Sequence, residues 1–537
     1  MKLTYKGIKE SSAWKRAGIE LPSYDPSAVA EATRTAPEWV HFGIGNIFRI
    51  FIGGIADSLL SGGYSDKGIP CAESFDFDVV DEIYRPFDNL VLAVTMHADG
   101  RQDKRVLGSL TEAVKAAVSD GESWTRLSEI ITQPGLQLVS FTITEKGYAL
   151  RSPDGNYLPY VAEDMKNGPD RVKGAMGIVT SLLYKRYKAG GYPIALVSMD
   201  NVSRNGEKLR ASVVETARMW TGNSFTEAGF VEYIENESVV SFPWTMIDKI
   251  TPRPGDAVSK MLRESGVEGM DILVTGKKTF IAPFANAEAP GYLVVEDSFP
   301  NGRPPLEKAG VFMTDRETVN KSERMKVTVC LNPVHTAVCT YARMLGYELF
   351  ADAIRDPDLA ELAHRLGYSE GLPVVEDPGI ISPEAFLDEL MTERFPNAYL
   401  GDTNARIAVD ISQMVGIRFG ETIKAYCAKD GSASALTAVP LAIAGWIRYL
   451  IAADDNCEPM ELSPDPMRPE LTAALSGIRP GDPDSIGSKL RPLLSNERIF
   501  GSDLYAAGLG SRIEEMVRDM LEGKGAVRAA LRKHLNK

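Results

Sequence analysis

The sequence predicts an α/β protein, with an N-terminal doubly wound domain over residues 1–304 and a mostly α-helical C-terminal domain over residues 305–537. The first half alternates short β-rich runs with helical patterns, which is typical of a mainly parallel sheet covered on both faces. Strand signals fade after Pro305, and helical patterns dominate the rest. The stretch 283–305, rich in proline and glycine, predicts the junction between the two domains.

Local patterns place the individual elements. The β-rich runs of the first domain are 39–45, 69–73, 90–95, 137–144 and 194–201, and its helical patterns include 112–118 and 172–189. The second domain shows helical patterns at 335–347, 359–368, 436–451 and 511–535. Its most apolar run, 435–453, contains Pro440 and Arg448, so we expect a buried helix there rather than a membrane span.

Composition narrows the functions open to the chain. The net charge of −14 argues against binding along a nucleic-acid backbone, whereas a small anionic substrate needs only a local positive pocket. The N-terminus lacks the apolar run of a signal peptide, so we expect a cytoplasmic protein. The sequence does not fix the oligomeric state and is compatible with a monomer. The cysteines form no CxxC pair, which favours free thiols; they are Cys71, Cys330, Cys339, Cys427 and Cys457.

A glycine pair follows the first strong strand, in 40-VHFGIGNIFR-49. A Rossmann-like domain holds a dinucleotide pyrophosphate at such a turn, because glycines turn tightly and the next helix supplies N–H donors. The turn comprises Gly43, Ile44, Gly45 and Asn46. Arg49 adds a cation that can reach a phosphate, but Phe48 stands at the third glycine position. Alone, this motif fits a plain tight turn equally well.

The second strand of such a domain should end in an acid that binds the adenosine ribose, about 20–30 residues further on. Glu73, after 69-IPCA-72, fits this position, and Asp76 is a weaker substitute. A carboxylate there accepts hydrogen bonds from the ribose hydroxyls and repels a 2′-phosphate, so we expect NAD rather than NADP. A solvated strand end is the other explanation of Glu73.

The stretch 323-ERMKVTVCLNPVH-335 brings together Lys326, Asn332 and His335. A dehydrogenase must remove a hydroxyl proton, either through a zinc ion or through a protein base. Dispersed histidines and cysteines give zinc little support, so we expect no metal. A buried lysine can act as the base, because burial favours the neutral amine. The alternative is structural: Asn332 caps a helix that starts at Pro333 and ends before Gly346, and His335 merely packs.

Ordered landmarks extend from about Val40 to about Lys424. They include 41-HFGIGNIFR-49, 142-TITEKGY-148, 199-MDNVSRNG-206, 293-LVVEDSFPNGRP-304, 323-ERMK-326, 332-NPVH-335 and 394-RFPNAYLGDTNARIAVDISQ-413. In these the chain resembles the polyol-specific long-chain dehydrogenase/reductase family, which includes the mannitol dehydrogenases. The strings 68-GIPCAESFDFDVVDEIYRPFDNL-90 and 418-RFGETIKAY-426 most resemble its fructuronate reductase (mannonate oxidoreductase) subgroup.

The resemblance implies roles for several residues. It implies a lysine general base, here Lys326, and an oxyanion hole made by two asparagine side chains, Asn201 and Asn332. The family histidine matches His335, which would orient the substrate or the oxyanion donors. Glu323 matches a glutamate that gates proton exchange between the lysine and solvent.

The resemblance also implies a substrate-binding arginine, here Arg406. A guanidinium suits the carboxylate of a sugar acid, which it can hold by two hydrogen bonds. Eight residues further on, Met414 replaces the substrate-contacting lysine of the family, and methionine cannot pair with a carboxylate. Arg418 and Lys424 are candidate replacement cations, although each is also explained as an ordinary structural or surface charge.

The spacing of the lysine and asparagine is a second departure. Lys326 and Asn332 are six residues apart, whereas the resemblance implies five. A fully extended segment would separate their α-carbons by about 20 Å, against about 9 Å in a helix. We therefore predict a compact segment that absorbs the additional residue as a bulge or tight turn beside the site.

Together these features predict a metal-independent oxidoreductase that transfers hydride between NAD(H) and a sugar acid of the D-fructuronate/D-mannonate type. Two alternatives remain open. One is a polyol 2-dehydrogenase acting on mannitol or arabinitol, in which Arg406 would have no substrate carboxylate to bind. The other is a catalytically silent regulator that binds NAD.

Overall fold

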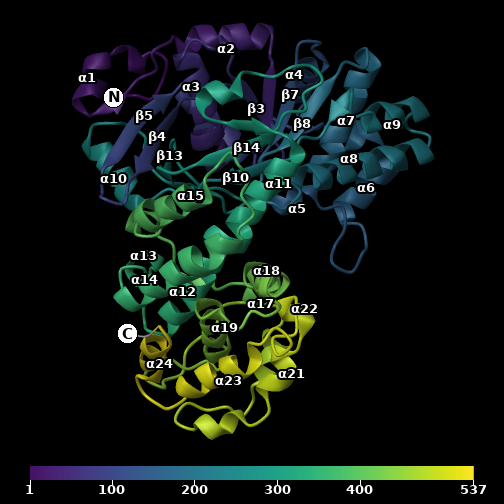
Figure 1. The fold of residues 1–537 in the computed structure, drawn as a ribbon. Coiled ribbons are helices and arrows are strands. Elements are labelled where there is room, and N and C mark those ends of the chain that lie inside the picture. Colours follow the sequence, from purple (N-terminus) through teal and green to yellow (C-terminus); the bar gives the residue numbers. More distant parts are fainter. Residues whose placement is uncertain (536–537) are drawn as a thin grey trace. The chain divides into compact units, whose positions relative to one another are not determined.

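The computed structural model describes residues 1–535, and the chain divides into two compact units. Unit 1 comprises Met1–His97 and Arg101–Asn320 and combines β-sheets with helices (Figure 1). Unit 2 comprises Ala98–Gly100 and the chain from Lys321 onward, and it is built from helices. This confirms the predicted fold class, an α/β N-terminal part followed by a mostly helical C-terminal part.

Unit 1 is organised around a six-stranded parallel sheet. Its strands, in spatial order, are β6 (Leu110–Lys115), β3 (Ile69–Glu73), β2 (Trp39–Phe42), β7 (Leu138–Phe141), β8 (Ile194–Ser198) and β9 (Val240–Ser241). The chain runs outward from β2 through β3 to β6, then returns to β7 and runs outward again to β9. Ligands of such doubly wound sheets bind outside the carboxyl ends of the strands where this reversal occurs, here β2 and β7.

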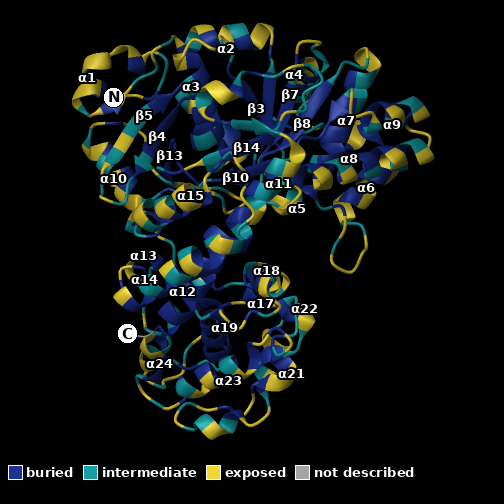
Figure 2. Cartoon of the chain, in the orientation of Figure 1, coloured by how far each residue is buried: buried dark blue, intermediate teal, exposed yellow. Residues whose placement is uncertain are grey.

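Both faces of this sheet are buried, which explains why its central strands are mostly apolar. Val40 and Phe42 point to one core cluster, and Trp39, which precedes Val40, points to the other. The first face is covered by α4 (Gly121–Thr132), α7 (Ala175–Ala189) and α8 (Asn205–Gly222), and the second by α3 (Gly53–Ser61). Figure 2 shows β7 and β8 buried along their length.

Two expected elements differ from the structure. Residues 112–118, predicted as helix, begin inside strand β6, because pairing with β3 determines the conformation of a run too short to fix its own. The strand expected at 90–95 is β4 (Val91–Met96), which lies outside the parallel sheet. It pairs antiparallel with β5 (Gln102–Leu107) and parallel with β13 (Phe284–Glu288), in a sheet of order β1-β5-β4-β13.

The remaining strands of unit 1 are β1 (Ile19–Glu20), β10 (Thr245–Asp248), β11 (Leu273–Val274), β12 (Phe280–Ile281), β14 (Tyr292–Glu296) and β15 (Phe312–Thr314). Its other helices are α1 (Ser11–Arg16), α2 (Pro26–Thr35), α5 (Thr144–Tyr148), α6 (Pro159–Asn167), α9 (Ala228–Glu235) and α10 (Asp256–Glu264). The order β10-β14-β15 forms a further small sheet, and β11 pairs with β12 as a hairpin.

Unit 2 is built around α19 (Ala438–Tyr449), every residue of which is buried (Figure 2). It packs against α12 (Asn332–Met344) so closely that a Cβ at Gly445 would lie 2.3 Å from the Tyr341 ring. Tyr341 also donates its hydroxyl to Leu441 O at 2.9 Å. The apolar run at 435–453 is therefore a buried helix, as predicted. Among residues 1–535, no helix has both the length and the apolar character needed to cross a bilayer.

The other helices of unit 2 surround this pair. They are α13 (Phe350–Ala353), α14 (Pro357–His364), α15 (Pro383–Glu389), α16 (Asn404–Ile407), α17 (Ile411–Arg418), α18 (Gly420–Asp430), α20 (Arg468–Ala474), α21 (Leu490–Leu494) and α22 (Glu497–Phe500). The helix expected at 511–535 is two helices, α23 (Gly510–Asp519) and α24 (Ala526–His534). Gly523 and Gly525 in the connection both have positive φ, and Gly525 occupies the N-cap position of α24.

The chain turns sharply where β2 ends. Gly43 has a φ of +90°, and a Cβ there would lie 2.1 Å from the carbonyl oxygen of Thr142, just after β7. The Thr142 hydroxyl donates to Gly43 O (2.9 Å), and Gly43 N donates to Ala72 O on β3 (3.0 Å). The turn is held from both neighbouring strands, so only glycine fits.

Replacing Gly43 by alanine should therefore destabilise unit 1. The added methyl group meets backbone rather than a flexible side chain, and alanine disfavours positive φ, so we expect the thermal midpoint to fall by about 4–8 °C. Gly45→Ala is the matched control, because a Cβ at Gly45 meets no atom within 4 Å. Equal midpoints for the two variants, measured by calorimetry, would contradict this account of the turn.

Candidate functional site

The turn after β2 leads into a helix whose first N–H groups lie at the carboxyl edge of the sheet. Asn46 is the first helical residue, and Arg49 N donates to Gly45 O at 3.1 Å. Gly45 is exposed, with open space where a Cβ would stand, so the backbone is accessible to a ligand. An open glycine backbone at a helix start, beside the reversal in strand order, fits a dinucleotide pyrophosphate.

Glu73, the last residue of β3, places its carboxylate against this turn. It accepts hydrogen bonds from Ile44 N (3.3 Å) and Phe75 N (2.8 Å). Burial raises the pKa of the Glu73 carboxyl above its ordinary value, while the backbone N–H groups favour the charged form. The side chain is only 9% exposed, so the solvated strand end considered as an alternative is excluded.

Arg49 does not lie on the open side of the turn. Arg49 is 1% exposed. Its Nη1 donates to Asn46 Oδ1 and to Phe284 O on β13, each at 3.4 Å. Burial lowers the pKa of the guanidinium from its ordinary value. The expected contact with a phosphate would require this side chain to leave the core of unit 1.

A carboxylate that the sequence reasoning missed joins the two loops after β7 and β8. Asp200 accepts hydrogen bonds from Ile143 N (2.9 Å), Thr144 N (3.0 Å) and Tyr148 Oη (2.6 Å). Burial raises its pKa above the ordinary value. The next residue, Asn201, is exposed at the carboxyl edge of the sheet. The Asp-Asn pair directly after a buried strand was the signal: the first residue anchors the loop that presents the second.

Asn205 anchors the same loop from the other end. Its Nδ2 donates to Asp200 O (3.0 Å) and to Thr245 Oγ1 (2.9 Å), while Oδ1 accepts from Thr245 N (3.0 Å). The side chain is 1% exposed. Asn205 therefore fixes the start of α8 and the position of the loop that carries Asn201.

In unit 2, Lys326 begins a π-helical turn, Lys326–Cys330, that continues α11 (Arg316–Met325) and leads into α12. Leu331 N donates to Lys326 O at 3.0 Å, a bond that spans five residues. This confirms the predicted compact segment, since a π-turn absorbs one residue more than an α-turn. Lys326 is 2% exposed, and Glu323 lies one turn earlier, partly buried.

Asn332 is not an N-cap, which corrects the structural alternative. It is the first residue of α12; Leu331 occupies the cap position, and no side chain caps the helix there. The Asn332 carbonyl accepts from the Thr336 hydroxyl at 2.9 Å. Because the preceding π-turn supplies the helix start, the Asn332 side chain is not needed for capping. The helix ends as expected, with Gly346 at a φ of +83°.

His335 lies in an aromatic setting on the first turns of α12. Its ring contacts Phe350 edge-on, with centroids 4.6 Å apart, and Phe395 at 4.9 Å. Burial lowers the pKa of the His335 imidazole to about 3. Three positive charges add to this effect: Arg394, Arg418 and Arg406. His335 is therefore neutral at physiological pH and can both donate and accept hydrogen bonds.

The expected substrate cations differ in their surroundings. Arg406 on α16 forms an ion pair with Asp402, and its side chain is 65% exposed. Lys424 pairs with Glu421 at 2.9 Å and is 48% exposed. Arg418, by contrast, turns inward and donates to Thr336 Oγ1 on α12 at 2.6 Å. Met414 is 38% exposed on α17.

All five cysteines are free thiols, as predicted. Two of them flank the segment Asn332–His335: Cys330 ends the π-turn and Cys339 lies on α12. Burial raises the pKa of each of these thiols to about 12. Neither can supply a thiolate nucleophile at neutral pH.

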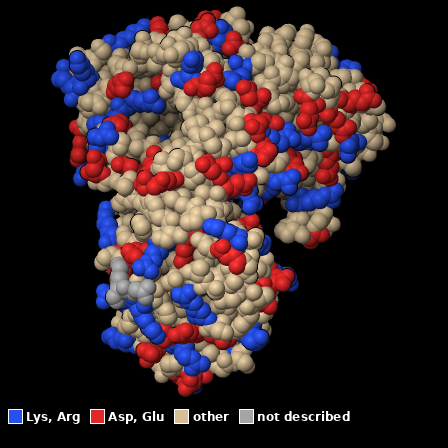
Figure 3. All heavy atoms as spheres, in the orientation of Figure 1, with Lys and Arg blue, Asp and Glu red and all other residues tan. Residues whose placement is uncertain are grey.

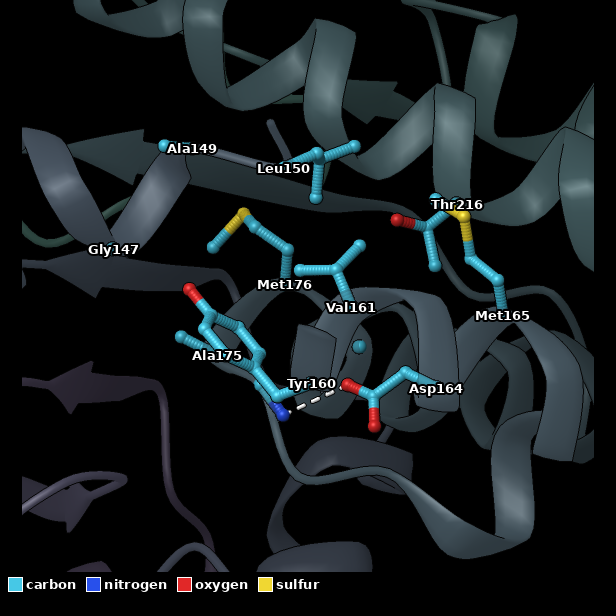
Figure 4. A pocket seen from close by; sticks show the side chains of 12 residues that line it. Gly147, Ala149, Leu150, Tyr160, Val161, Asp164, Met165, Ala175, Met176 and Thr216 are labelled. Atoms are coloured by element: carbon cyan, nitrogen blue, oxygen red, sulfur yellow. Dashed lines mark hydrogen bonds between the residues drawn. The ribbon is translucent and has the colours of Figure 1, made fainter. Parts of the chain in front are cut away.

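A further pocket in unit 1 has a structural explanation. Figure 4 shows it lined mostly by apolar side chains, with Tyr160 and Thr216 as polar members and Asp164 as its charged group. That carboxylate accepts from Lys173 N and Gly174 N, both at 2.8 Å, and so holds the start of α7. The Asp164 carboxylate of this pocket is therefore used by the fold.

Surface charge is mixed rather than concentrated. On the face that Figure 3 shows, lysines and arginines are interspersed with acidic side chains.

Among residues 1–535, no three His, Cys, Asp or Glu side chains gather as a metal-binding group. The candidate chemistry of unit 2 is carried by Lys326, Asn332 and His335.

Two family models match the chain. The mannitol dehydrogenase Rossmann domain matches residues 37–308, and the mannitol dehydrogenase C-terminal domain matches residues 318–521. The two matched segments together extend over most of the sequence.

Individual relatives are similar to this chain over nearly its whole length. D-mannonate oxidoreductase of Thermotoga maritima is 49% identical over 534 residues, which cover 99% of this chain and 98% of the relative. A solved D-sorbitol dehydrogenase in substrate-free form has a TM-score of 0.78 at 25% identity, over 96% of this chain and 98% of that chain. Pseudomonas fluorescens mannitol 2-dehydrogenase, solved in a ternary complex with NAD and D-mannitol, has a TM-score of 0.71 at 25% identity, over 100% of both chains.

The π-turn generates a prediction about deletions. Removing Val327, which is partly buried, should convert Lys326–Cys330 into an ordinary α-turn and leave the flanking helices in phase. Removing Ala337 inside α12 is the control, because it rotates one half of a buried helix by about 100° against the other. We expect a cooperative thermal transition for the first variant and loss of folded unit 2 for the second. Equal damage in circular dichroism would show that the π-turn is required for folding.

Proposed function

The chain belongs to the mannitol dehydrogenase family, and on this basis we propose that it is an NAD-dependent oxidoreductase interconverting a 2-keto sugar acid, such as D-fructuronate, and an aldonate, such as D-mannonate. The nearly full-length likeness to the D-mannonate oxidoreductase of Thermotoga maritima carries this proposal. A polyol dehydrogenase is the second candidate, because the solved relatives are named for sorbitol and mannitol.

The residues of unit 1 fit the cofactor. The turn Gly43–Asn46, whose backbone is open at Gly45, would receive the pyrophosphate, and Glu73 beside it would accept from the adenosine ribose. NAD, when bound, supplies the nicotinamide C4 that accepts or gives the hydride. The loop held by Asp200 presents Asn201 at the same edge of the sheet, where its carboxamide would donate to the substrate oxygen.

The residues of unit 2 supply the proton chemistry. Lys326, which is almost completely buried, accepts the hydroxyl proton during oxidation. Asn332 donates to the oxygen as alkoxide character develops. Neutral His335 orients the substrate hydroxyl groups, Glu323 exchanges the proton with solvent one turn away, and Arg406 contacts the substrate at the exposed side.

Replacing Lys326 by alanine tests the base. We expect kcat/KM for D-mannonate oxidation to fall about 10²–10⁴-fold, because the proton then has no positioned acceptor. Lys424→Ala is the control, since that lysine is exposed and paired with Glu421. A substrate panel of hexuronates, aldonates and polyols with both nicotinamide cofactors accompanies the measurement. Unchanged turnover in Lys326→Ala would remove the proposed base, and a strong preference for polyols would favour the second candidate.

Cofactor choice gives a separate prediction. Glu73→Ala should narrow the preference for NAD over NADP, because the carboxylate that repels a 2′-phosphate is gone. The ratio of kcat/KM values for the two cofactors measures this. Since Glu73 also holds Ile44 N, the thermal midpoint should be followed in parallel. An unchanged cofactor ratio in a folded variant would remove the ribose assignment.

A further inference from the structure

Arg418, the last residue of α17, has a guanidinium that the proposed mechanism does not use. Its Nη1 donates to Thr336 Oγ1 at 2.6 Å, and the Thr336 hydroxyl donates in turn to Asn332 O at 2.9 Å. Thr336 lies one helical turn after Asn332 and directly after His335. The guanidinium is therefore positioned beside the helix that carries the proposed oxyanion donor.

The charge of Arg418 is not compensated. Within residues 1–535, no carboxylate lies within ion-pair distance of it, and its buried Nε makes no hydrogen bond. Burial lowers the pKa of the guanidinium from its ordinary value, and no carboxylate is among the groups that oppose this shift. A largely buried charge without a partner costs free energy, so its retention calls for an explanation.

Two buried arginines of this chain, Arg186 and Arg448, are satisfied by carbonyl oxygens of the protein itself. Arg186 is 0% exposed and donates to five carbonyl oxygens: those of Ile131, Gln133, Leu136, Tyr192 and Pro193. Arg448, also 0% exposed, donates to three carbonyl oxygens: those of Ala453, Asp454 and Met520. These side chains serve the fold. Arg418 makes one bond to a hydroxyl and remains partly exposed, so most of its donors are left for a ligand.

Neighbouring groups do not neutralise this charge. His335 stays neutral, since its pKa is about 3 through burial and nearby arginines. The nearby Arg406 already has Asp402 as its partner, and Lys424 has Glu421. Met414, one turn before Arg418 on α17, carries no charge. The surroundings of Arg418 are therefore positive and lack an anion.

We propose that Arg418 binds the carboxylate of the sugar acid substrate and takes the place of the lysine that Met414 replaces. Its planar fork can hold a carboxylate by two hydrogen bonds while Nη1 keeps Thr336 in position. This inference rests on the proposed function and goes beyond it by naming the group that separates sugar acids from neutral polyols. Arg406, paired and exposed, then contributes less to this selection.

The test compares D-mannonate and D-mannitol as substrates of the full chain with NAD. In Arg418→Met, we expect the preference for D-mannonate to fall about 10- to 100-fold, the range for a lost charge-assisted hydrogen bond, mainly through a higher KM. Arg418→Lys should restore part of it, because a point charge without the fork remains. Arg406→Met should change the preference less than Arg418→Met.

Two controls separate recognition from packing. Thr336→Val removes the hydroxyl that joins α17 to α12 but leaves the guanidinium, so it should lower the thermal midpoint while keeping the substrate preference. Lys424→Met removes an exposed cation and should change neither. If Thr336→Val reproduces the loss seen in Arg418→Met, or if Arg406→Met accounts for the whole loss, the inference is overturned.

Measurements on the wild-type protein distinguish the proposed function from the inference about Arg418. If it oxidises D-mannonate and Arg418→Met keeps the same preference, the inference falls and the proposed function stands. If it turns over neither compound, calorimetric titration of D-mannonate and D-mannitol into the NAD-bound protein decides. Tighter binding of the acid that depends on Arg418 supports the inference without the proposed reaction, and equal binding of acid and polyol overturns it.

Discussion

The sheet of unit 1 depends on one close approach, that of Gly43 to the carbonyl of Thr142. Because β2 is paired on both sides, its end is held by β3 and β7 together, and the chain can leave only outward over the carboxyl edge. The carboxylates of Glu73 and Asp200 accept hydrogen bonds from backbone N–H groups of the loops at that edge. These two acids thus fix the shape of the backbone at that edge.

Unit 2 uses helix rather than loop to position its polar groups. The segment from α11 through the π-turn into α12 carries Glu323, Lys326, Asn332 and His335 on one helical path, with Leu331 as the only residue outside regular helix between Arg316 and Met344. Helical backbone fixes side chains more firmly than a loop does. The buried α19 behind α12 supports this path, since Tyr341 and Gly445 lock the two helices together.

The sequence was sufficient where local chemistry decides the structure. The glycine turn, the parallel sheet that follows from strand–helix alternation, and the compact Lys326–Asn332 segment could be predicted, because each follows from backbone geometry or chain reach. Residues 112–118 could not, since their strand conformation comes from pairing with β3. The positions of Arg49 and Arg418 could not either: whether a cation points inward depends on tertiary neighbours, Phe284 and Thr336, that are distant in sequence.

The burial of Cys330 and Cys339 has a consequence for how readily their thiols are modified. Because burial raises the pKa of each thiol to about 12, the reactive thiolate is scarce at neutral pH. Oxidants and alkylating agents can attack these sulfurs only when the surrounding helices open. The rate of covalent labelling at these two positions therefore reports how often the helices that carry Lys326 and Asn332 open.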